Sequence, residues 1–109
     1  MSHYLRLSEF HVRPECEAEF VRIYGSHGDW VRLFHRADGF CGTELLRDQE
    51  TACRYITVDR WTSEAAYNAF VRRFSGEYHA LDAASERLNL AEPPIGSFIT
   101  VDESAQART

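Results

Sequence analysis

The residues Arg54-Tyr-Ile-Thr-Val-Asp-Arg-Trp61 are followed at once by Thr62-Ser-Glu-Ala-Ala-Tyr-Asn-Ala-Phe-Val-Arg-Arg-Phe74. The first stretch alternates and is rich in β-branched and aromatic side chains, which is typical of a strand. In the second stretch Ala66, Phe70 and Phe74 recur every four residues, so one side of a helix is apolar. The two patterns predict a strand that turns directly into an amphipathic helix.

The corner between this strand and this helix is a candidate pocket wall. Ser63 can accept a hydrogen bond from a free amide at the start of the helix, so the turn is short. We expect Trp61, Tyr67 and Phe70 near the mouth of a pocket between sheet and helix. The alternative is that these aromatic side chains are only core, where large apolar residues usually lie.

Composition and length limit the class of protein. The chain has 109 residues, 44% of them hydrophobic and 27% charged, which indicates one folded domain. The net charge of −5 and the lack of a long basic run argue against nucleic acid or an anionic membrane as a partner. No apolar run reaches the roughly 20 residues of a membrane span, and the first residues lack a signal-peptide pattern. We therefore expect a cytoplasmic protein.

The cysteines are Cys16, Cys41 and Cys53, an odd number without C-x-x-C spacing. This pattern argues against a disulfide framework and against a zinc site, so reduced thiols are expected. The histidines are equally scattered, and we expect no metal site.

Outward from the central stretch, periodicity and breaks predict the other elements. Strands are expected at 4–12, 40–47, 53–61 and 95–101. Helices are expected from residue 14 to 24, over 29–34, over 63–74 and over 77–90, with breaks at 25–28 and 75–76. Residues 1–102 would form a single domain, and residues 103–109 a flexible tail.

This order is β-α-β-β-α-β with an extra helix before the last strand. It predicts an α+β, ferredoxin-like fold with a four-stranded antiparallel sheet and helices on one face. The first strand has Leu5 and Leu7 on one face and Phe10 and Val12 on the other. Apolar residues on both faces favour a homodimer in which two sheets pack together.

Two further places could carry chemistry. The segment Gly25-Ser-His-Gly28 interrupts a helical pattern, so His27 and Trp30 are candidate substrate-binding residues at a pocket entrance; a plain loop is the alternative. His79 follows the aromatic helix and could exchange protons near neutral pH, or it could be a surface or helix-capping residue. The sequence has no G-x-S-x-G motif, no Walker glycine loop, no dinucleotide-binding fingerprint and no H-E-x-x-H motif.

Several short motifs together resemble the antibiotic biosynthesis monooxygenase domain. The resemblance covers most of the chain and rests on Phe10-x-Val12, the helix with Phe20, Gly39-Phe40-x-Gly42-Thr43, Tyr55-x-x-Val58-x-x-Trp61-x-Ser63-x-x-Ala66-Tyr67-x-x-Phe70, and Ile95-Gly96-Ser97-Phe98. It implies a dimeric α+β barrel. Members of the family include cofactor-free oxygenases of polyphenols, quinol oxygenases and haem degraders.

The resemblance also implies roles for single residues. Trp61 and Tyr67 stand where anthrone-type oxygenases bind substrate, and Thr57 stands where those enzymes have an asparagine. Haem degraders use a helix tryptophan, a first-strand asparagine and a histidine further on. This chain has Phe70 and Phe10 in the first two places, and His79 lies one residue from the third. The resemblance therefore argues against haem degradation.

The resulting hypothesis is a cofactor-independent monooxygenase that uses dioxygen on an electron-rich aromatic, such as a phenol, quinol or anthrone. Trp61, Phe70 and Phe74 would hold the ring. The hydroxyl would be bound or deprotonated by one of Tyr67, Thr57 and His79. The alternative is a non-catalytic small-molecule-binding protein of the same fold, which Thr57 in place of the asparagine favours.

Overall fold

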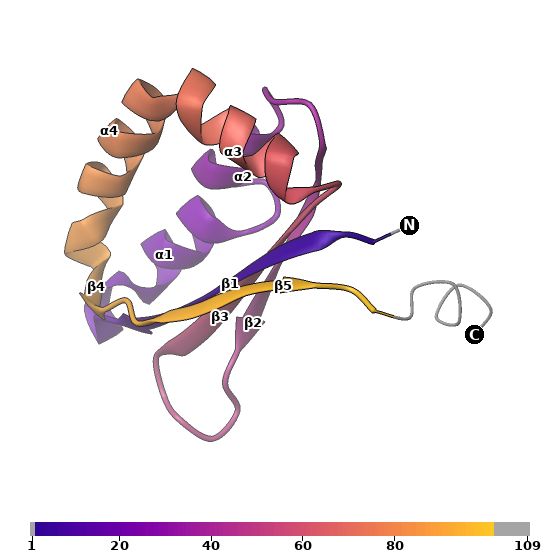
Figure 1. The fold of residues 1–109 in the computed structure, drawn as a ribbon. Helices are drawn as coiled ribbons and strands as arrows, with labels where there is room; N and C mark the ends of the chain where they lie inside the picture. The colour runs from indigo at the N-terminus through magenta and orange to yellow at the C-terminus, as the bar shows by residue number, and fades with distance from the viewer. Residues whose placement is uncertain (1, 102–109) are drawn as a thin grey trace.

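The computed structural model describes residues 2–101 and has an α+β fold (Figure 1). Its elements in chain order are β1 (Tyr4–Val12), the 3-10 turn η1 (Pro14–Cys16), α1 (Glu17–Tyr24), α2 (Asp29–Phe34), β2 (Phe40–Arg47), β3 (Arg54–Trp61), α3 (Glu64–Arg73), α4 (Ser75–Ser85), the 3-10 turn η2 (Glu86–Leu88), β4 (Asn89–Ala91) and β5 (Pro94–Ile99). The tail expected at 103–109 lies outside the described residues.

The sheet is antiparallel and has β1 at its centre. Its order is β2-β3-β1-β4, and β5 also pairs with β1. The β1–β3 register runs from Tyr4 opposite Trp61 to His11 opposite Arg54. The predicted ferredoxin-like α+β fold is therefore confirmed, with the small strand β4 as an addition.

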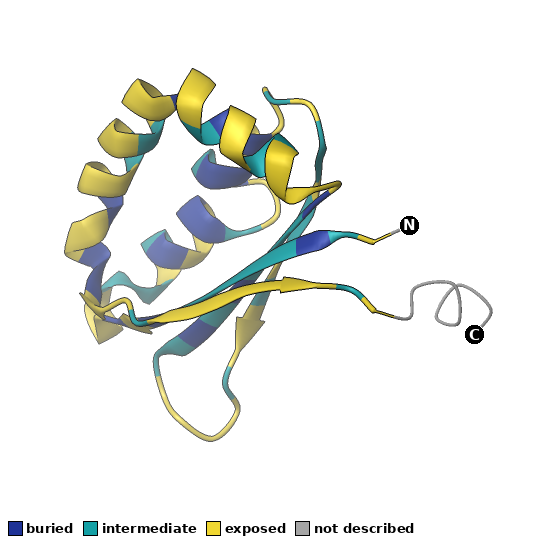
Figure 2. Cartoon of the chain, in the orientation of Figure 1, coloured by how far each residue is buried: buried dark blue, intermediate teal, exposed yellow. Residues whose placement is uncertain are grey.

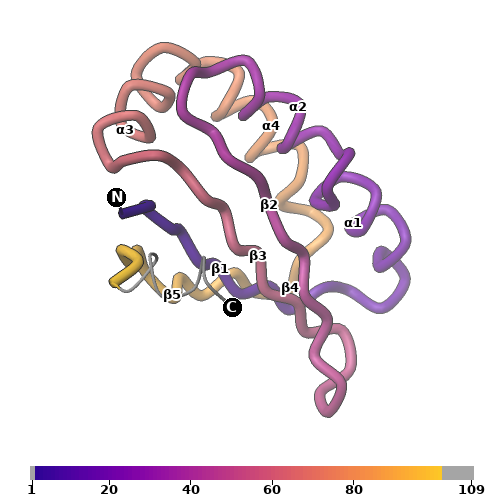
Figure 3. Tube along the Cα trace, turned by 90° about the vertical axis from the view of Figure 1, so that its right-hand side faces the viewer, coloured from indigo at the N-terminus to yellow at the C-terminus, as the bar shows by residue number. Residues whose placement is uncertain are grey.

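The helices cover one face of the sheet, which we call the inner face (Figure 3). Alternation along β1 and β3 sends every second side chain to this face. Tyr4, Phe10, Tyr55 and Trp61 are inward-facing and buried. The core lies between these side chains and the buried sides of the helices (Figure 2).

The strand-to-helix corner forms as its sequence predicts. The Ser63 hydroxyl accepts a hydrogen bond from the Ala66 amide at 3.1 Å, which caps α3. Gly39 has a φ of 92°, and a Cβ there would lie 2.7 Å from the Ala66 Cβ. The turn before β2 can therefore approach the start of α3 only with glycine at this position.

The predicted helix over 77–90 is wrong at both ends. α4 begins at Ser75, so only Phe74 separates it from α3, and the expected break at 75–76 does not occur. α4 ends at Ser85, and the chain then forms η2 and β4. The reason lies far away in the sequence: Asn89 pairs with Val12 of β1, and Leu88 is fully buried.

The other boundaries shift by smaller amounts. The helix expected from residue 14 starts as the 3-10 turn η1, and α1 begins at Glu17. β3 begins at Arg54, because Cys53 has a positive φ of 63° and belongs to the hairpin turn. The last strand is Pro94–Ile99 rather than 95–101. No helix within residues 2–101 has the length and apolar character needed to cross a membrane.

The opposite, outer face of the sheet is covered by no element of the described chain (Figure 3). Its register places apolar side chains from four strands on this face, of which Leu46 and Phe98 are the most exposed. The six side chains are Leu5, Leu7, Leu46, Ile56, Val58 and Phe98.

Candidate functional site

A cavity of about 150 Å³ lies between the inner face of the sheet and the helices. Its sheet side is formed by Arg6, Ser8, Phe10, Thr43, Thr57 and Asp59. Its helix side is formed by Tyr24, Trp30, Phe34, Tyr67, Tyr78 and Asp82, and Glu92 and Pro94 complete the lining. Asp82, Glu92 and Pro94 are exposed, so the cavity reaches the surface beside them.

Strand register brings the polar part of this lining together. Asp59 of β3 lies opposite Arg6 of β1 on one side and opposite Thr43 of β2 on the other. The next inward pair is Ser8 opposite Thr57. The sheet therefore offers the cavity a carboxylate, a guanidinium and three hydroxyl groups.

Asp59 is held by one neutral partner. Its Oδ1 accepts a hydrogen bond from the Thr43 hydroxyl at 2.7 Å. Among the described residues it forms no ion pair. Burial away from water raises the pKa of Asp59 to about 6, and the Thr43 bond and the charge of Arg6 oppose this rise only in part.

Arg6 is also held by neutral groups. Its Nη1 donates to the Tyr4 hydroxyl at 3.2 Å, and its Cζ lies 4.3 Å from the centre of the Tyr67 ring. The stacking fixes the guanidinium against the wall of the cavity.

The tyrosines of the lining remain protonated at neutral pH. Burial, followed by the influence of Tyr78, raises the pKa of Tyr67 to about 12. Burial and the charge of Glu92 raise the pKa of Tyr24 to about 12. These phenols can therefore donate hydrogen bonds to a ligand but cannot serve as bases near neutral pH.

Trp30 contributes an unused donor. Its ring packs against Tyr24, Phe34 and Tyr78 with ring centres 5.2–6.2 Å apart. Its indole Nε1 is buried and has no hydrogen-bond partner within residues 2–101.

The residues expected at the site divide into two groups. Thr57, Tyr67 and Trp30 line the cavity. Trp61, Phe70 and Phe74 are at most 5% exposed and lie in the aromatic core outside the lining. The physical reason is that Trp61 is enclosed by other rings. These rings are Phe34, Phe40, Tyr67 and Phe70.

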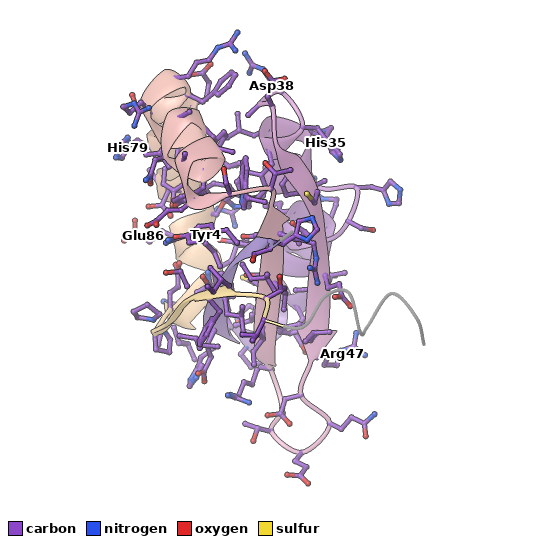
Figure 4. All side chains as sticks on the ribbon, turned by 45° about the vertical axis from the view of Figure 1, so that its right-hand side comes forward. Tyr4, His35, Asp38, Arg47, His79 and Glu86 are labelled. Atoms are coloured by element: carbon purple, nitrogen blue, oxygen red, sulfur yellow. The ribbon has the colours of Figure 1, made fainter. Side chains whose placement is uncertain are left out.

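The two histidines expected at the site lie outside the cavity lining as well. His79 is exposed on the outer side of α4 (Figure 4), and its Nδ1 lies 2.7 Å from the Ser75 carbonyl oxygen. His27 is exposed in the loop before α2, where its Nδ1 lies 3.2 Å from the Ser26 hydroxyl.

Arg6, Thr43 and Asp59 are cavity residues that the sequence reasoning missed. The alternation of β1 and β3 did carry a signal, because Arg6 shares its phase with Tyr4 and Phe10, and Asp59 shares its phase with Tyr55. Charged residues on a face that is largely buried are candidates for a site. Residues 2–101 contain no group of three or more His, Cys, Asp and Glu side chains that could hold a metal ion.

Solved structures share this fold at low sequence identity. A variant of SnoaB, a cofactor-independent oxygenase from Streptomyces nogalater, is 18% identical with a TM-score of 0.71, covering 91% of each chain. A candidate antibiotic biosynthesis monooxygenase from Bordetella bronchiseptica is 21% identical with a TM-score of 0.72, covering 94% of this chain and 98% of that one. Rv0793 from Mycobacterium tuberculosis is 14% identical with a TM-score of 0.65, covering 93% and 94%.

Sequence comparison gives the family. Among curated proteins, none matches this chain by sequence. The family model described as antibiotic biosynthesis monooxygenase matches residues 4–81, which run from β1 into α4 and include most of the cavity lining. The chain therefore belongs to the antibiotic biosynthesis monooxygenase family.

Proposed function

We propose that this protein is a cofactor-independent monooxygenase that uses dioxygen to oxidise a small, electron-rich aromatic compound with an acidic hydroxyl group. The observation that carries the proposal is one cavity in which aromatic walls surround a carboxylate and a guanidinium. Family membership supports an oxygenase, and SnoaB, a neighbour in fold, is described as a cofactor-independent oxygenase.

The size of the cavity sets the size of the group it can hold. A cavity of about 150 Å³ is large enough for one benzene-sized ring. Larger ring systems would extend toward the surface beside Asp82 and Glu92. The reacting ring would then contact Trp30 and Tyr67, with Thr57 in reach of its oxygen. Trp61, Phe70 and Phe74 would support these walls from behind, and the proposal assigns no role to His27 or His79.

The reaction needs no reductant other than the substrate. In an anthrone-like compound, loss of a proton gives an aromatic anion that can transfer electrons to dioxygen. One oxygen atom enters the ring as a carbonyl, replacing two hydrogens, and the other oxygen atom leaves with those hydrogens as water. The protein has to bind the ring, promote the loss of the proton and keep the anion in place.

A second copy of the chain is the proposed partner. The six apolar side chains of the outer sheet face would be buried by another sheet, at a gain of about 25 cal/mol for each Å² removed from water. Light scattering should give twice the chain mass of 12.6 kDa. A mass of one chain at micromolar concentration would contradict the homodimer.

The function is tested with an oxygen electrode and a panel of dihydroxynaphthalenes and hydroxylated anthrones, without added metal or flavin. We expect protein-dependent oxygen uptake. Thr57→Val should lower the rate roughly fivefold, because a lost hydrogen bond costs about 1 kcal/mol. Thr51→Val, an exposed change in the β2–β3 hairpin, is the matched control. No oxygen uptake with compounds that calorimetry shows to bind would favour the non-catalytic binding protein.

A further inference from the structure

The relation between Arg6 and Asp59 is unusual for opposite charges on neighbouring strands. The two residues are directly opposite in the β1–β3 register and face the same cavity. Side chains in such positions lie close enough to interact, and opposite charges there commonly pair. Within the described chain these two do not: Arg6 turns to Tyr4 and the Tyr67 ring, and Asp59 turns to Thr43.

Both charged groups therefore keep hydrogen-bonding capacity for a ligand. The Thr43 hydroxyl occupies Oδ1 of Asp59, and Oδ2 has no partner in the part of the chain that the structure describes. Arg6 uses only Nη1 for its bond to the Tyr4 hydroxyl. A hydroxyl group that enters the cavity can donate to the carboxylate and have the guanidinium nearby.

Building on the proposed function, we propose that Asp59 is the general base of this site and that Arg6 holds the anion that Asp59 produces. The substrate class is thereby narrowed to aromatics that enter neutral and react as an oxyanion. Thr43 acts as a positioning residue, because its hydroxyl fixes one carboxylate oxygen and leaves the other for the substrate.

The proposed step is balanced in charge. The substrate O–H bond breaks, its proton binds Oδ2 of Asp59, and the electron pair stays on the substrate oxygen. The negative charge thus moves from the carboxylate to the substrate beside Arg6, and the net charge of the site does not change. Dioxygen is the oxidant that then accepts electrons from this anion.

Other groups of the cavity are poorer bases. Tyr24 and Tyr67 hold their protons, since burial raises the pKa of each to about 12. Asp82 and Glu92 are exposed at the mouth; burial also raises the pKa of Glu92, but its Oε2 already accepts a hydrogen bond from Asn89. Asp59, with its pKa raised to about 6 by burial, is ionised at neutral pH and still basic enough to accept a proton. The titratable and charged groups that share the cavity with Asp59 are Arg6 of β1, Tyr24 of α1, Tyr67 of α3, Tyr78 and Asp82 of α4, and Glu92.

The kinetic test compares Asp59→Asn with wild type in the oxygen-uptake assay across pH. We expect kcat to fall by about 100-fold or more, as for other general bases. The wild-type rate should rise as pH increases through about 6, and the variant should lack this rise. Asp38→Asn, in the exposed turn between α2 and β2 (Figure 4), is the matched control and should behave as wild type. An unchanged kcat and an unchanged pH profile in Asp59→Asn would overturn the proposal.

A binding test separates this inference from the proposed function, since it requires no turnover. The probe is 4-nitrophenol, whose phenolate absorbs visible light, at a pH just below the pKa of the free phenol. In wild type we expect bound phenolate with little proton release to the solvent, because Asp59 takes the proton. In Asp59→Asn we expect one proton released for each phenolate formed, and Arg6→Gln should lower the bound phenolate fraction.

The two tests give distinct failures. Equal proton release from wild type and Asp59→Asn would exclude Asp59 as the base, whatever the oxygen electrode shows. Retained proton uptake by wild type without oxygen consumption would contradict the monooxygenase and leave the base assignment standing. Should Asp59→Asn fold poorly, wild type alone is informative: its bound phenolate fraction should fall as pH drops through about 6, and a constant fraction would overturn the proposal.

Discussion

Strands β1 and β3 carry an arginine and a carboxylate on each face of the sheet, and the two faces use them differently. On the outer face Arg54 Nε donates to Glu9 Oε2 at 2.7 Å, and Arg54 Nη1 donates to Asp48 Oδ2 at 2.7 Å. His11 Nε2 also lies 2.6 Å from Glu9 Oε2. On the inner face Arg6 and Asp59 lie opposite each other without pairing.

The pKa values of the two carboxyl groups are therefore shifted in opposite directions. Hydrogen bonds from Arg54 and then His11 lower the pKa of Glu9 to about 2, whereas burial raises the pKa of Asp59 to about 6. A carboxylate with its partners in place is part of the structure, and a desolvated carboxylate that lacks an ionic partner is a candidate for function. The two faces differ in whether the carboxylate has an ionic partner, and not in the types of residue that they carry.

The largest expected effect is a loss of stability, and it tests whether the inner face is well packed outside the cavity around Asp59. Trp61 is the next inward-facing residue after Asp59 on β3, and it is fully buried among aromatic rings. Trp61→Ala should lower the free energy of unfolding by about 3–5 kcal/mol, measured by urea denaturation. Trp61→Phe is the conservative control and should lose much less.

A small loss in Trp61→Ala would mean that the inner face is loosely packed throughout. The unpaired state of Asp59 would then be an incidental result of poor packing, and the contrast between the faces would lose its meaning.

The second prediction is a gain of stability. The folded pKa of Asp59 is about 6 against a usual 3.8, so folding binds its proton more tightly, and stability falls as pH rises through this interval. At about 1.4 kcal/mol for each pKa unit the upper limit is roughly 3 kcal/mol, and solvent screening of a partly exposed group reduces it to about 1–2 kcal/mol. Asp59→Asn should therefore be more stable than wild type above about pH 6 and equal to it near pH 4.

Glu9→Gln is the control for that result, because it makes the same chemical change on the outer face. Removing a paired carboxylate should destabilise the protein at neutral pH, so the two variants should differ in sign. A loss of stability in both would show that Asp59 is a structural residue, and its role as a base would then rest on the kinetic tests alone.

Features that depend on neighbouring residues could be predicted from the sequence, and features that depend on distant residues could not. Ser63 as helix cap acts within a few positions, and it was predicted. β4 was missed because Asn89 reaches its partner Val12 only through the completed fold. The sequence also did not show which residue of α4 faces the cavity: Tyr78 lines it, and the neighbouring His79 faces solvent.

Some inward-facing residues of β3 lie in the core and others line the cavity, and the sequence of the strand does not show which. Strand alternation sends Thr57, Asp59 and Trp61 to the same face, but it does not say which position the helices fill. Rings from α2 and α3 enclose Trp61, and the space beside Asp59 stays open. The helix packing that decides this is not a local property of the strand.

The smallest expected effect concerns Arg54, and it sharpens the comparison from the outer face. Arg54→Gln removes the main cause of the low pKa of Glu9, which should rise from about 2 toward its usual 4.5, as an NMR titration of the carboxyl carbon would show. A depressed carboxylate stabilises the fold above its unfolded pKa and loses this contribution as pH falls through its folded pKa. The variant should therefore be slightly less stable than wild type at neutral pH. The difference should vanish toward pH 2 and shrink in high salt, which screens such a pair.

Oxygen uptake should be unchanged, because Arg54 does not line the cavity. If Arg54→Gln instead shifted the pH profile of turnover as Asp59→Asn is expected to do, the two faces would be electrostatically coupled, and the separation of a structural outer pair from a functional inner pair would fail.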